Sequence, residues 1–323
     1  MTFNPDITVP SGSPTPIAQV VGPAPPPRKK RRRWLGCALR AAFGTVLLGA
    51  LVIGGVFILY RLIPPPRTNI LVLGLDARPG EPDVTRTDAM MLVTVDPRQP
   101  YTGMLSIPRD LYVNVPGYGY NRINTAHVFG ESTGAGNGPV LAAQTVSNAF
   151  GISVHRTVRL NFDGFVAIID AAGGIRVDVP TYIIDYEYPT NDYGTTVIEF
   201  QPGPQTMNGE RALQYARTRH GSSDFDRAAR QQQIVVAFVR KMANPLNWPR
   251  IPAVYSAVAQ NVDTNLTVFD ALALGPAVLM SGNIEQEVLD RTYVRGTMTS
   301  TGASVQEPNW VAINPLIDRM FRR

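Results

Sequence analysis

The chain has 323 residues, of which 44% are hydrophobic and 17% are charged, and its formal net charge is +5. This composition excludes a wholly disordered chain and leaves enough apolar residues for a large folded domain. The single cysteine, Cys37, excludes a disulfide framework and a thiolate-ligated metal site in that domain. The positive excess comes from the run Arg28–Arg33, so the domain that follows is nearly neutral and is not expected to bind nucleic acid nonspecifically.

The N-terminal part predicts a tail followed by a membrane anchor. Residues 1–27 are rich in Pro, Ser, Thr and Val and cannot bury enough apolar surface to fold. Residues 41–60 contain no charge and are long enough for one transmembrane helix, which needs about 20 residues. A cleaved signal peptide is the competing interpretation, but its apolar region is shorter and ends at small residues, whereas this run ends at Tyr60 and Arg61. We therefore expect a disordered tail over residues 1–33, a signal anchor over 34–63 and one domain over 64–323.

The basic run before the apolar segment predicts the orientation of the anchor. Arg28–Arg33 and Arg40 lie on its N-terminal side, and positively charged flanks remain on the cytoplasmic side of a membrane. A nuclear signal or a nucleic-acid patch is the alternative for such a run, but its place beside the apolar segment favours a topology signal. The prediction is a single-pass membrane protein with a cytoplasmic N-terminus and an extracytoplasmic domain.

The domain from residue 64 onward shows alternating strand and helix patterns. Short apolar runs with β-branched residues predict strands, and longer segments with helical spacing predict helices. The expected strands are 69–75, 90–95, 103–107, 156–160 and 175–179, and the expected helices are 140–150, 162–172, 209–217 and 226–242. Residues 246–323 are assigned to the same domain as closing helices and one late strand. This alternation predicts an α/β fold in the form of an α-β-α sandwich.

Arginines and carboxylates recur together across the middle of this domain. The guanidinium group binds phosphate oxygens in a bidentate manner. Mg²⁺ prefers oxygen ligands and usually takes one or two carboxylates together with the phosphates of a substrate. The pattern therefore predicts a site for a polyphosphate and a divalent metal. Its members are Asp76, Arg86, Asp88, Arg109, Arg217, Arg219, Asp224, Arg227, Arg230 and Gln231.

The sequence alone does not exclude a purely structural role for these residues. A lone Asp–Arg pair is more often a surface ion pair, which contributes about 0–1 kcal/mol. Asp224 could serve only as a helix N-cap. The histidines are far apart and show no metal-ligand spacing, and no Walker-type phosphate-binding loop occurs.

Seven segments of the domain resemble the LytR-CpsA-Psr family of membrane-anchored phosphotransferases. They occur in the family's order and at similar spacing over nearly the whole outer domain: NILVLGLDARPG, RTDAMMLVTVDP, LSIPRDLYVNVPG, NRINTAHVFG, NFDGFVAIIDAAGGIRVDVP, GPQTMNGERALQYARTRH and SDFDRAARQQQ. The resemblance implies an α-β-α sandwich with an apolar tunnel for a lipid chain. It also implies transfer of a glycopolymer from a polyprenyl-pyrophosphate carrier to the cell wall, usually to peptidoglycan.

The resemblance further implies a role for each matching residue. The metal ligands would be Asp76 and Asp88, and the metal would be Mg²⁺ or Mn²⁺. The pyrophosphate ligands would be Arg78, Arg86, Arg109, Arg217, Arg219 and Gln231. The catalytic residues near the phosphate would be Arg86, Arg109, Asp224 and Arg227. An apolar stripe at helical spacing, which could be core or tunnel lining, consists of Phe162, Phe165, Ile168 and Ile169.

The expected function is Mg²⁺-assisted transfer of a lipid-linked glycopolymer. The implied partners are the polyprenyl-pyrophosphate-linked glycan, a peptidoglycan acceptor and membrane lipid, without nucleic acid. One alternative is hydrolysis of the same lipid pyrophosphate with water as the acceptor. A second alternative is a regulator of transcription, a label that family members have carried, although a domain outside the cytoplasm argues against direct DNA binding.

Overall fold

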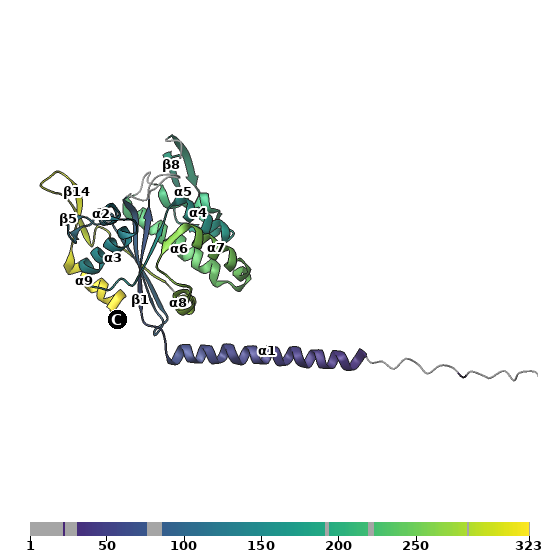
Figure 1. The fold of residues 1–323 in the computed structure, drawn as a ribbon. Coiled ribbons are helices and arrows are strands. Elements are labelled where there is room, and N and C mark those ends of the chain that lie inside the picture. The colour runs from purple at the N-terminus through teal and green to yellow at the C-terminus, as the bar shows by residue number, and fades with distance from the viewer. Residues whose placement is uncertain are drawn as a thin grey trace, which may run out of the picture. The chain divides into compact units, whose positions relative to one another are not determined.

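The computed structural model describes residues 22, 31–75, 86–190, 194–218, 223–282 and 284–322. The chain divides into two units, Met1–Leu59 and Tyr60–Arg323, and the second contains the folded domain (Figure 1). The predicted tail lies almost entirely outside the described residues, and the predicted membrane span falls within helix α1 (Arg31–Leu62). Within the described part of the chain, no helix combines the length and the apolar character that a membrane span requires. The side chains at positions 31–39, 46, 50, 52, 53 and 56 of α1 lie outside that part.

A mixed six-stranded sheet forms the centre of the domain (Figure 1). Its strand order is β11-β6-β1-β2-β3-β12. Strands β1, β2 and β3 pair antiparallel, whereas β6 runs parallel to β1 and β12 runs parallel to β3. The strands are β1 (Thr68–Leu75), β2 (Thr87–Asp96), β3 (Tyr101–Ile107), β6 (Arg156–Leu160), β11 (Val262–Thr264) and β12 (Ile284–Val288).

Helices cover both faces of this sheet, because the apolar side chains of β1 alternate between the faces. Leu71 and Leu73 are fully buried in the larger core, with α2 (Thr125–Thr133), α3 (Asn137–Phe150) and α9 (Trp310–Ile317). Ile70 and Val72 belong to two smaller clusters with α8 (Val268–Met280) and α6 (Asp224–Ala243). Figure 1 shows α2, α3 and α9 on one side of the sheet and α6 and α8 on the other. The mixed α/β fold is therefore confirmed.

A further core lies under α4 (Phe162–Ala171) and α5 (Gly209–Arg217). Ile169, Tyr215 and Ile234 pack in it with apolar residues of two small sheets. One of these sheets pairs β7 with β10, and the other pairs β8 with β9. The remaining elements are β4 (Tyr112–Val115), β5 (Gly119–Arg122), β7 (Ile175–Val179), β8 (Ile183–Pro189), β9 (Thr195–Phe200), β10 (Gly203–Met207), β13 (Val294–Met298), β14 (Ser304–Pro308), a 3₁₀ turn (Pro245–Arg250), α7 (Ile251–Asn261) and a π turn (Asp318–Arg322).

Short polar residues begin the helices that surround the candidate site. The side chains of Asn161 and Asn208 each accept a backbone hydrogen bond at the start of α4 and α5. Ser223 and Asp226 form a reciprocal capping box at the start of α6. Asp224 is thus the first residue of α6 and not its N-cap, so the N-cap interpretation of Asp224 is wrong, and its carboxylate is available for other contacts.

The C-terminal part holds more strand than the sequence predicts. The described part of residues 246–323, where one late strand is expected, contains β11, β12, β13 and β14. β12 completes the edge of the central sheet, and β13 pairs with β14 in a separate hairpin. In the segment IEQEV of β12, Gln286 interrupts the apolar positions between Ile284 and Val288, so the apolar alternation of a strand is lost.

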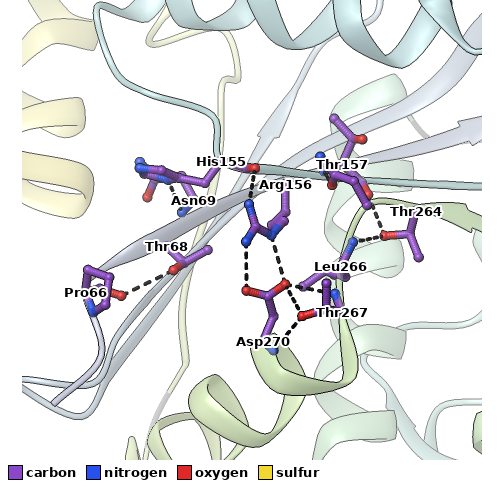
Figure 2. Close-up of polar contacts among 11 residues, drawn as sticks. Pro66, Thr68, Asn69, His155, Arg156, Thr157, Thr264, Leu266, Thr267 and Asp270 are labelled. Carbon is purple, nitrogen blue, oxygen red and sulfur yellow. Dashed lines mark hydrogen bonds and ion pairs between the residues drawn. The ribbon is translucent and has the colours of Figure 1, made fainter.

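Arg156 of β6 holds Asp270 at the start of α8 (Figure 2). Its Nε and Nη2 donate to the two carboxylate oxygens of Asp270 at 2.9 and 3.0 Å. The backbone N and the hydroxyl of Thr267 donate to the same carboxylate, each at 2.8 Å. These hydrogen bonds, that of Arg156 first, hold the pKa of Asp270 well below its ordinary value of 3.8.

Replacing Asp270 by asparagine is expected to lower the free energy of unfolding by about 1 kcal/mol at neutral pH. Because the pKa is depressed in the folded state, this stabilisation is present above about pH 4 and is lost as the pH falls through the folded-state pKa. Urea unfolding of wild type and Asp270→Asn at pH 7 and pH 2.5 measures the effect. The difference in the free energy of unfolding between the two proteins should be smaller at pH 2.5 than at pH 7. An equal difference at both pH values would contradict the stabilising role of the Asp270 carboxylate.

Candidate active site

A cavity of about 740 Å³ lies between the central sheet and helices α4, α5 and α6. A volume of this size falls in the range of small-molecule binding pockets. Its apolar lining includes Val72, Met91, Leu160, Phe162, Phe165, Leu213, Ala216 and Val235. Its polar lining includes Asp88, Asn161, Asp185, Glu187, Arg217, Arg227 and Gln231. The cavity can therefore hold an apolar chain together with a charged group.

Two members of the apolar stripe line this cavity and the other two do not. Phe162 and Phe165 of α4 are part of the lining, whereas Ile169 is 3% exposed and packs in the core beneath it. Ile168 is half-buried. The stripe thus contributes to the core and to the lining of the cavity, on neighbouring turns of one helix.

A second, much smaller hollow of about 30 Å³ adjoins the first. Asp88, Arg227 and Gln231 line both hollows. Arg109 and Asp224 line the smaller one. Residues from β2, from the loop after β3 and from α6 therefore form one polar region at the border of the two.

Asp88, Arg109, Asp224 and Arg227 form a connected ion-pair network in this region. Arg109 Nη1 lies 2.9 Å from Asp88 Oδ1, and Arg109 Nε lies 3.4 Å from Asp224 Oδ2. Arg227 Nη1 lies 3.4 Å from the other carboxylate oxygen of Asp224. Arg227 Nη2 also donates to the backbone oxygen of Asp88 at 3.3 Å. Asp224 thus bridges two guanidinium groups and ties the start of α6 to the end of β3.

Burial distinguishes this network from a surface ion pair. The side chain of Arg227 is only 7% exposed, and that of Arg109 is 30% exposed. Burial by itself lowers the pKa of Arg109, but the charges of Asp88 and Asp224 outweigh it and leave that pKa above its ordinary value. The guanidinium groups therefore stay charged and fixed, as a receptor for phosphate oxygens requires.

Arg217 reaches the cavity from the last turn of α5. Its guanidinium carbon lies 4.0 Å from the centre of the Phe162 ring. Its Nη1 donates to the hydroxyl oxygen of Tyr188 at 3.4 Å. Burial raises the pKa of Tyr188, so its hydroxyl stays protonated. Stacking on an aromatic face orients a guanidinium group while leaving its edge for an anionic ligand.

A buried lock holds the chain directly after Arg217. The hydroxyl of Thr218 donates to Asp185 Oδ2 at 2.8 Å. Arg230 donates through Nε to the backbone oxygen of Tyr215 at 3.1 Å and through Nη2 to that of Thr218. Burial lowers the pKa of Arg230. Thr218, Asp185 and Arg230 are between 1% and 6% exposed, so these bonds exclude water and fix where Arg217 points.

Close packing of α5 on α4 also depends on a glycine. Gly209 donates its backbone N–H to Asp170 Oδ1 at 2.7 Å. A Cβ atom at this position would lie 2.4 Å from the backbone oxygen of Val166. Only glycine allows this approach, which brings Phe162 and Arg217 to the same cavity.

The other residues of the predicted site lie as follows. Arg86, directly before β2, is exposed. It does not belong to the described residues that line the two hollows. Asp76, Arg78 and Arg219 lie outside the described residues. The sequence does not predict Asp185, Glu187 and Tyr188 of β8 or the role of Thr218. Arg230, which the sequence places in the phosphate site, instead bonds the backbone of Tyr215 and Thr218 and is outside the lining of both hollows.

The donor chemistry fits a divalent metal that is bound partly by a substrate. The carboxylate of Asp88 lines the cavity beside Arg227. Asp76 is the residue after Leu75, which lines the same cavity and pairs with Thr87 in the sheet. Within the described ranges, no cluster of three or more His, Cys, Asp or Glu side chains could hold a metal. Mg²⁺ that takes one or two carboxylates and completes its shell with phosphates and water needs no such cluster.

Comparison with known proteins places the chain in a family. The sequence profile of the LytR_cpsA_psr family matches residues 66–320. The polyisoprenyl-teichoic acid–peptidoglycan teichoic acid transferase TagU of Oceanobacillus iheyensis is 33% identical over 271 residues, which cover 74% of this chain and 79% of that protein. The corresponding transferase TagT of Bacillus subtilis is 34% identical over 220 residues, which cover 67% of this chain and 66% of that protein.

A solved structure of TagT bound to LIIa-WTA has the same fold. It matches with a TM-score of 0.64 and 28% sequence identity, over 80% of this chain and 90% of that one. The family profile covers the sheet, the cavity and the ion-pair network together. This chain is therefore a member of the LytR-CpsA-Psr family.

Proposed function

We propose that this protein transfers a glycopolymer from a polyprenyl-pyrophosphate carrier to peptidoglycan. The observation that carries the proposal is a single cavity that combines an apolar lining with carboxylates, the half-buried Arg217 and the buried Arg227. An apolar tail gains about 0.8 kcal/mol for each CH₂ group that it buries. A pyrophosphate on the same molecule would meet the charged region formed by Asp88, Arg217 and Arg227. The names of the relatives, which are teichoic acid transferases, agree with this chemistry.

The reaction assigned to the site is a displacement at phosphorus. A hydroxyl oxygen of the acceptor glycan forms a bond to the phosphorus that carries the glycopolymer. The bond from that phosphorus to the bridging oxygen breaks and polyprenyl phosphate leaves, and its freed oxygen takes up the proton that the hydroxyl gives up. Arg109, Arg217 and Arg227 stabilise the charge that develops on the phosphate oxygens. Asp224, held between two arginines, lies where it can accept a hydrogen bond from the incoming hydroxyl.

The proposed metal site contains Asp88 and Asp76. A bound Mg²⁺ or Mn²⁺ would neutralise phosphate charge and favour departure of polyprenyl phosphate. Arg109 holds Asp88 through Oδ1, so the carboxylate is oriented before a ligand binds. Arg86, Arg219 and Arg78 complete the proposed pyrophosphate site.

The proposed cellular setting is the outer face of a membrane. The uncharged segment 41–60 and the basic run before it support a signal anchor with a cytoplasmic N-terminus. The complete architecture would be an α-β-α sandwich on one membrane helix. A polyprenyl carrier is a membrane lipid, so an anchored domain on the outer surface would have donor and acceptor within reach.

Incubation of the full chain with a defined polyprenyl-pyrophosphate glycan, with and without peptidoglycan, tests the function. We expect polyprenyl phosphate to be released together with a phosphodiester between glycan and peptidoglycan. Release at the same rate without peptidoglycan, with a free glycan phosphate as product, would establish hydrolysis instead. Absence of any cleavage in both samples would reject the transferase and the hydrolase alike.

Filling the cavity should weaken binding of the lipid tail. Ala216 is 6% exposed and lines the cavity, so a tryptophan there would occupy the space of the tail. Ala216→Trp is expected to raise KM for a long-chain carrier by about tenfold, because buried apolar contact is lost. Steady-state rates with long and short carriers measure the effect, which should be larger for the long one. Val311→Trp, at an 87% exposed position, is the control. Equal KM values for the long-chain carrier in wild type, Ala216→Trp and Val311→Trp would contradict the placement of the lipid tail in this cavity.

A further inference from the structure

Helix α8 presents large apolar side chains to solvent. Phe269 is 81% exposed, Leu272 is 68% exposed and Leu279 is 47% exposed. Their spacing of three and seven residues places them along one side of the helix. The opposite side is buried, since Leu274 and Ala277 pack against Val95 of the sheet. The helix is therefore apolar on its outer side as well as on its inner side, which is unusual for a helix on the surface of a soluble domain.

The outer side of α8 carries no charge. Asp270 is the only charged residue of the helix. Arg156 and Thr267 hold its carboxylate at the first turn (Figure 2). The stripe formed by Phe269, Leu272 and Leu279 is thus an uninterrupted apolar surface.

The end of the proposed membrane anchor contacts α8. Tyr60, the last residue of the uncharged segment, donates its hydroxyl to the backbone oxygen of Ala273 in α8 at 3.0 Å. The next apolar residues, Leu62 and Ile63, are 74% and 73% exposed. The place where the chain would leave the bilayer is therefore in contact with the helix that exposes apolar side chains.

We propose that the α8 stripe, together with Leu62 and Ile63, rests in the interfacial layer of the phospholipid bilayer. This proposal depends on the proposed signal anchor, which puts Tyr60 at the membrane surface. Apolar side chains gain free energy when they leave water for the boundary between head groups and acyl chains, and a helix with such a face lies in the plane of that boundary. Docking through α8 would fix the domain against the membrane that supplies its lipid substrate.

Collision accessibility of spin labels in the full chain tests this surface. Cysteines introduced one at a time at Leu51, Leu272, Leu279 and Val311, on a Cys37→Ser background, carry the label in phosphatidylglycerol–phosphatidylcholine nanodiscs. Labels at Leu272 and Leu279 are expected to collide more with oxygen than with a water-soluble nickel complex. The label at Val311, an exposed position on α9, is expected to show the reverse.

Each other outcome rejects the proposal in a different way. Labels on α8 as accessible to nickel as that at Val311 would show that α8 stays in water. Shielding of the α8 labels from both reagents would show that protein, such as a second copy of the chain, covers the stripe. A label at Leu51 that is exposed to nickel would reject the anchor itself, and with it the proposed membrane setting. Glycan transfer is not read out in this experiment, so its result is independent of the catalytic assignments.

A double substitution gives a functional test of the same surface. Phe269→Ser with Leu272→Ser is expected to lower the transfer rate about tenfold for a bilayer-embedded carrier, because the apolar contact with the bilayer is lost. The rate for a short, water-soluble carrier should not change, since neither residue lines the cavity. An equal loss with both carriers, or no loss with either, would reject docking through α8.

Discussion

Replacing Arg109 by alanine is expected to lower the rate of glycan transfer by about 10²–10³-fold, the usual effect of removing one preorganised charge-stabilising donor. Arg109 binds Asp88 and Asp224 at once, so the substitution leaves two carboxylates facing the phosphate without their shared cation. Initial rates of transfer by the purified full chain measure the loss. Thermal unfolding of the same samples shows whether the fold is kept.

Two further variants separate the charge of Arg109 from its donor geometry and control for the loss of an exposed arginine. Arg109→Lys keeps the charge but cannot place two donors in a fork, so its rate should lie between wild type and the alanine variant. Arg295→Ala removes an arginine that is 82% exposed and pairs with Glu307. Its rate should stay within about twofold of wild type, since exposed ion pairs contribute little. Arg109→Ala at the rate of Arg295→Ala would refute the role of the network.

Replacing Thr218 by valine should reduce the transfer rate about 10- to 100-fold, because small misplacements of a substrate-binding group are costly. The hydroxyl of Thr218 is the donor to the buried carboxylate of Asp185. Its loss should also lower the free energy of unfolding by about 1–3 kcal/mol, the cost of weakening the hydrogen bonding of a buried charged group. Rates and urea unfolding of the same protein measure both effects.

Thr218→Ser is the matched control for this lock, since serine keeps the hydroxyl and loses one methyl group. It should retain most of the wild-type rate and stability. Losses in Thr218→Ser as large as those in Thr218→Val would contradict the role of the hydroxyl, because serine keeps the donor to Asp185 whereas valine removes it. Loss of stability without loss of rate in Thr218→Val would mean that the lock does not position Arg217.

The elements around the site could be predicted because their signals are local. The spacing of Arg227 and Gln231 predicts one face of a helix, and both residues line the same two hollows of the structure. Asn161 precedes an apolar segment of helical period and caps α4. The continuous apolar runs of β1 and β2 predict buried strands, and these strands lie in the centre of the sheet.

The lock around Thr218 could not be predicted because its partners are distant in sequence. Asp185 lies in β8, where the pairing with β9 shifts register between Asp185 and Tyr188. Such a bulge redirects side chains in a way that alternation does not reveal. The sequence of α6 predicts that Arg230 lies on a polar face of the helix. The structure shows instead that Arg230 is only 6% exposed.

The apolar stripe of α4 shows why lining and core are hard to separate. Phe165 and Ile169 are four residues apart and share a helix face in the sequence. The structure turns one toward the cavity and buries the other against the small sheets. Apolar side chains are favourable both in a cavity lining and in the core, so composition alone does not distinguish the two environments.

A structure of the full chain with a polyprenyl-pyrophosphate glycan tests the central claim most directly. The account predicts the lipid tail against Phe165 and Val235 inside the cavity. It predicts the pyrophosphate within hydrogen-bonding distance of Arg217 and Arg227. A tail bound outside the space between α4 and α6, or a pyrophosphate beyond reach of both arginines, would contradict the account.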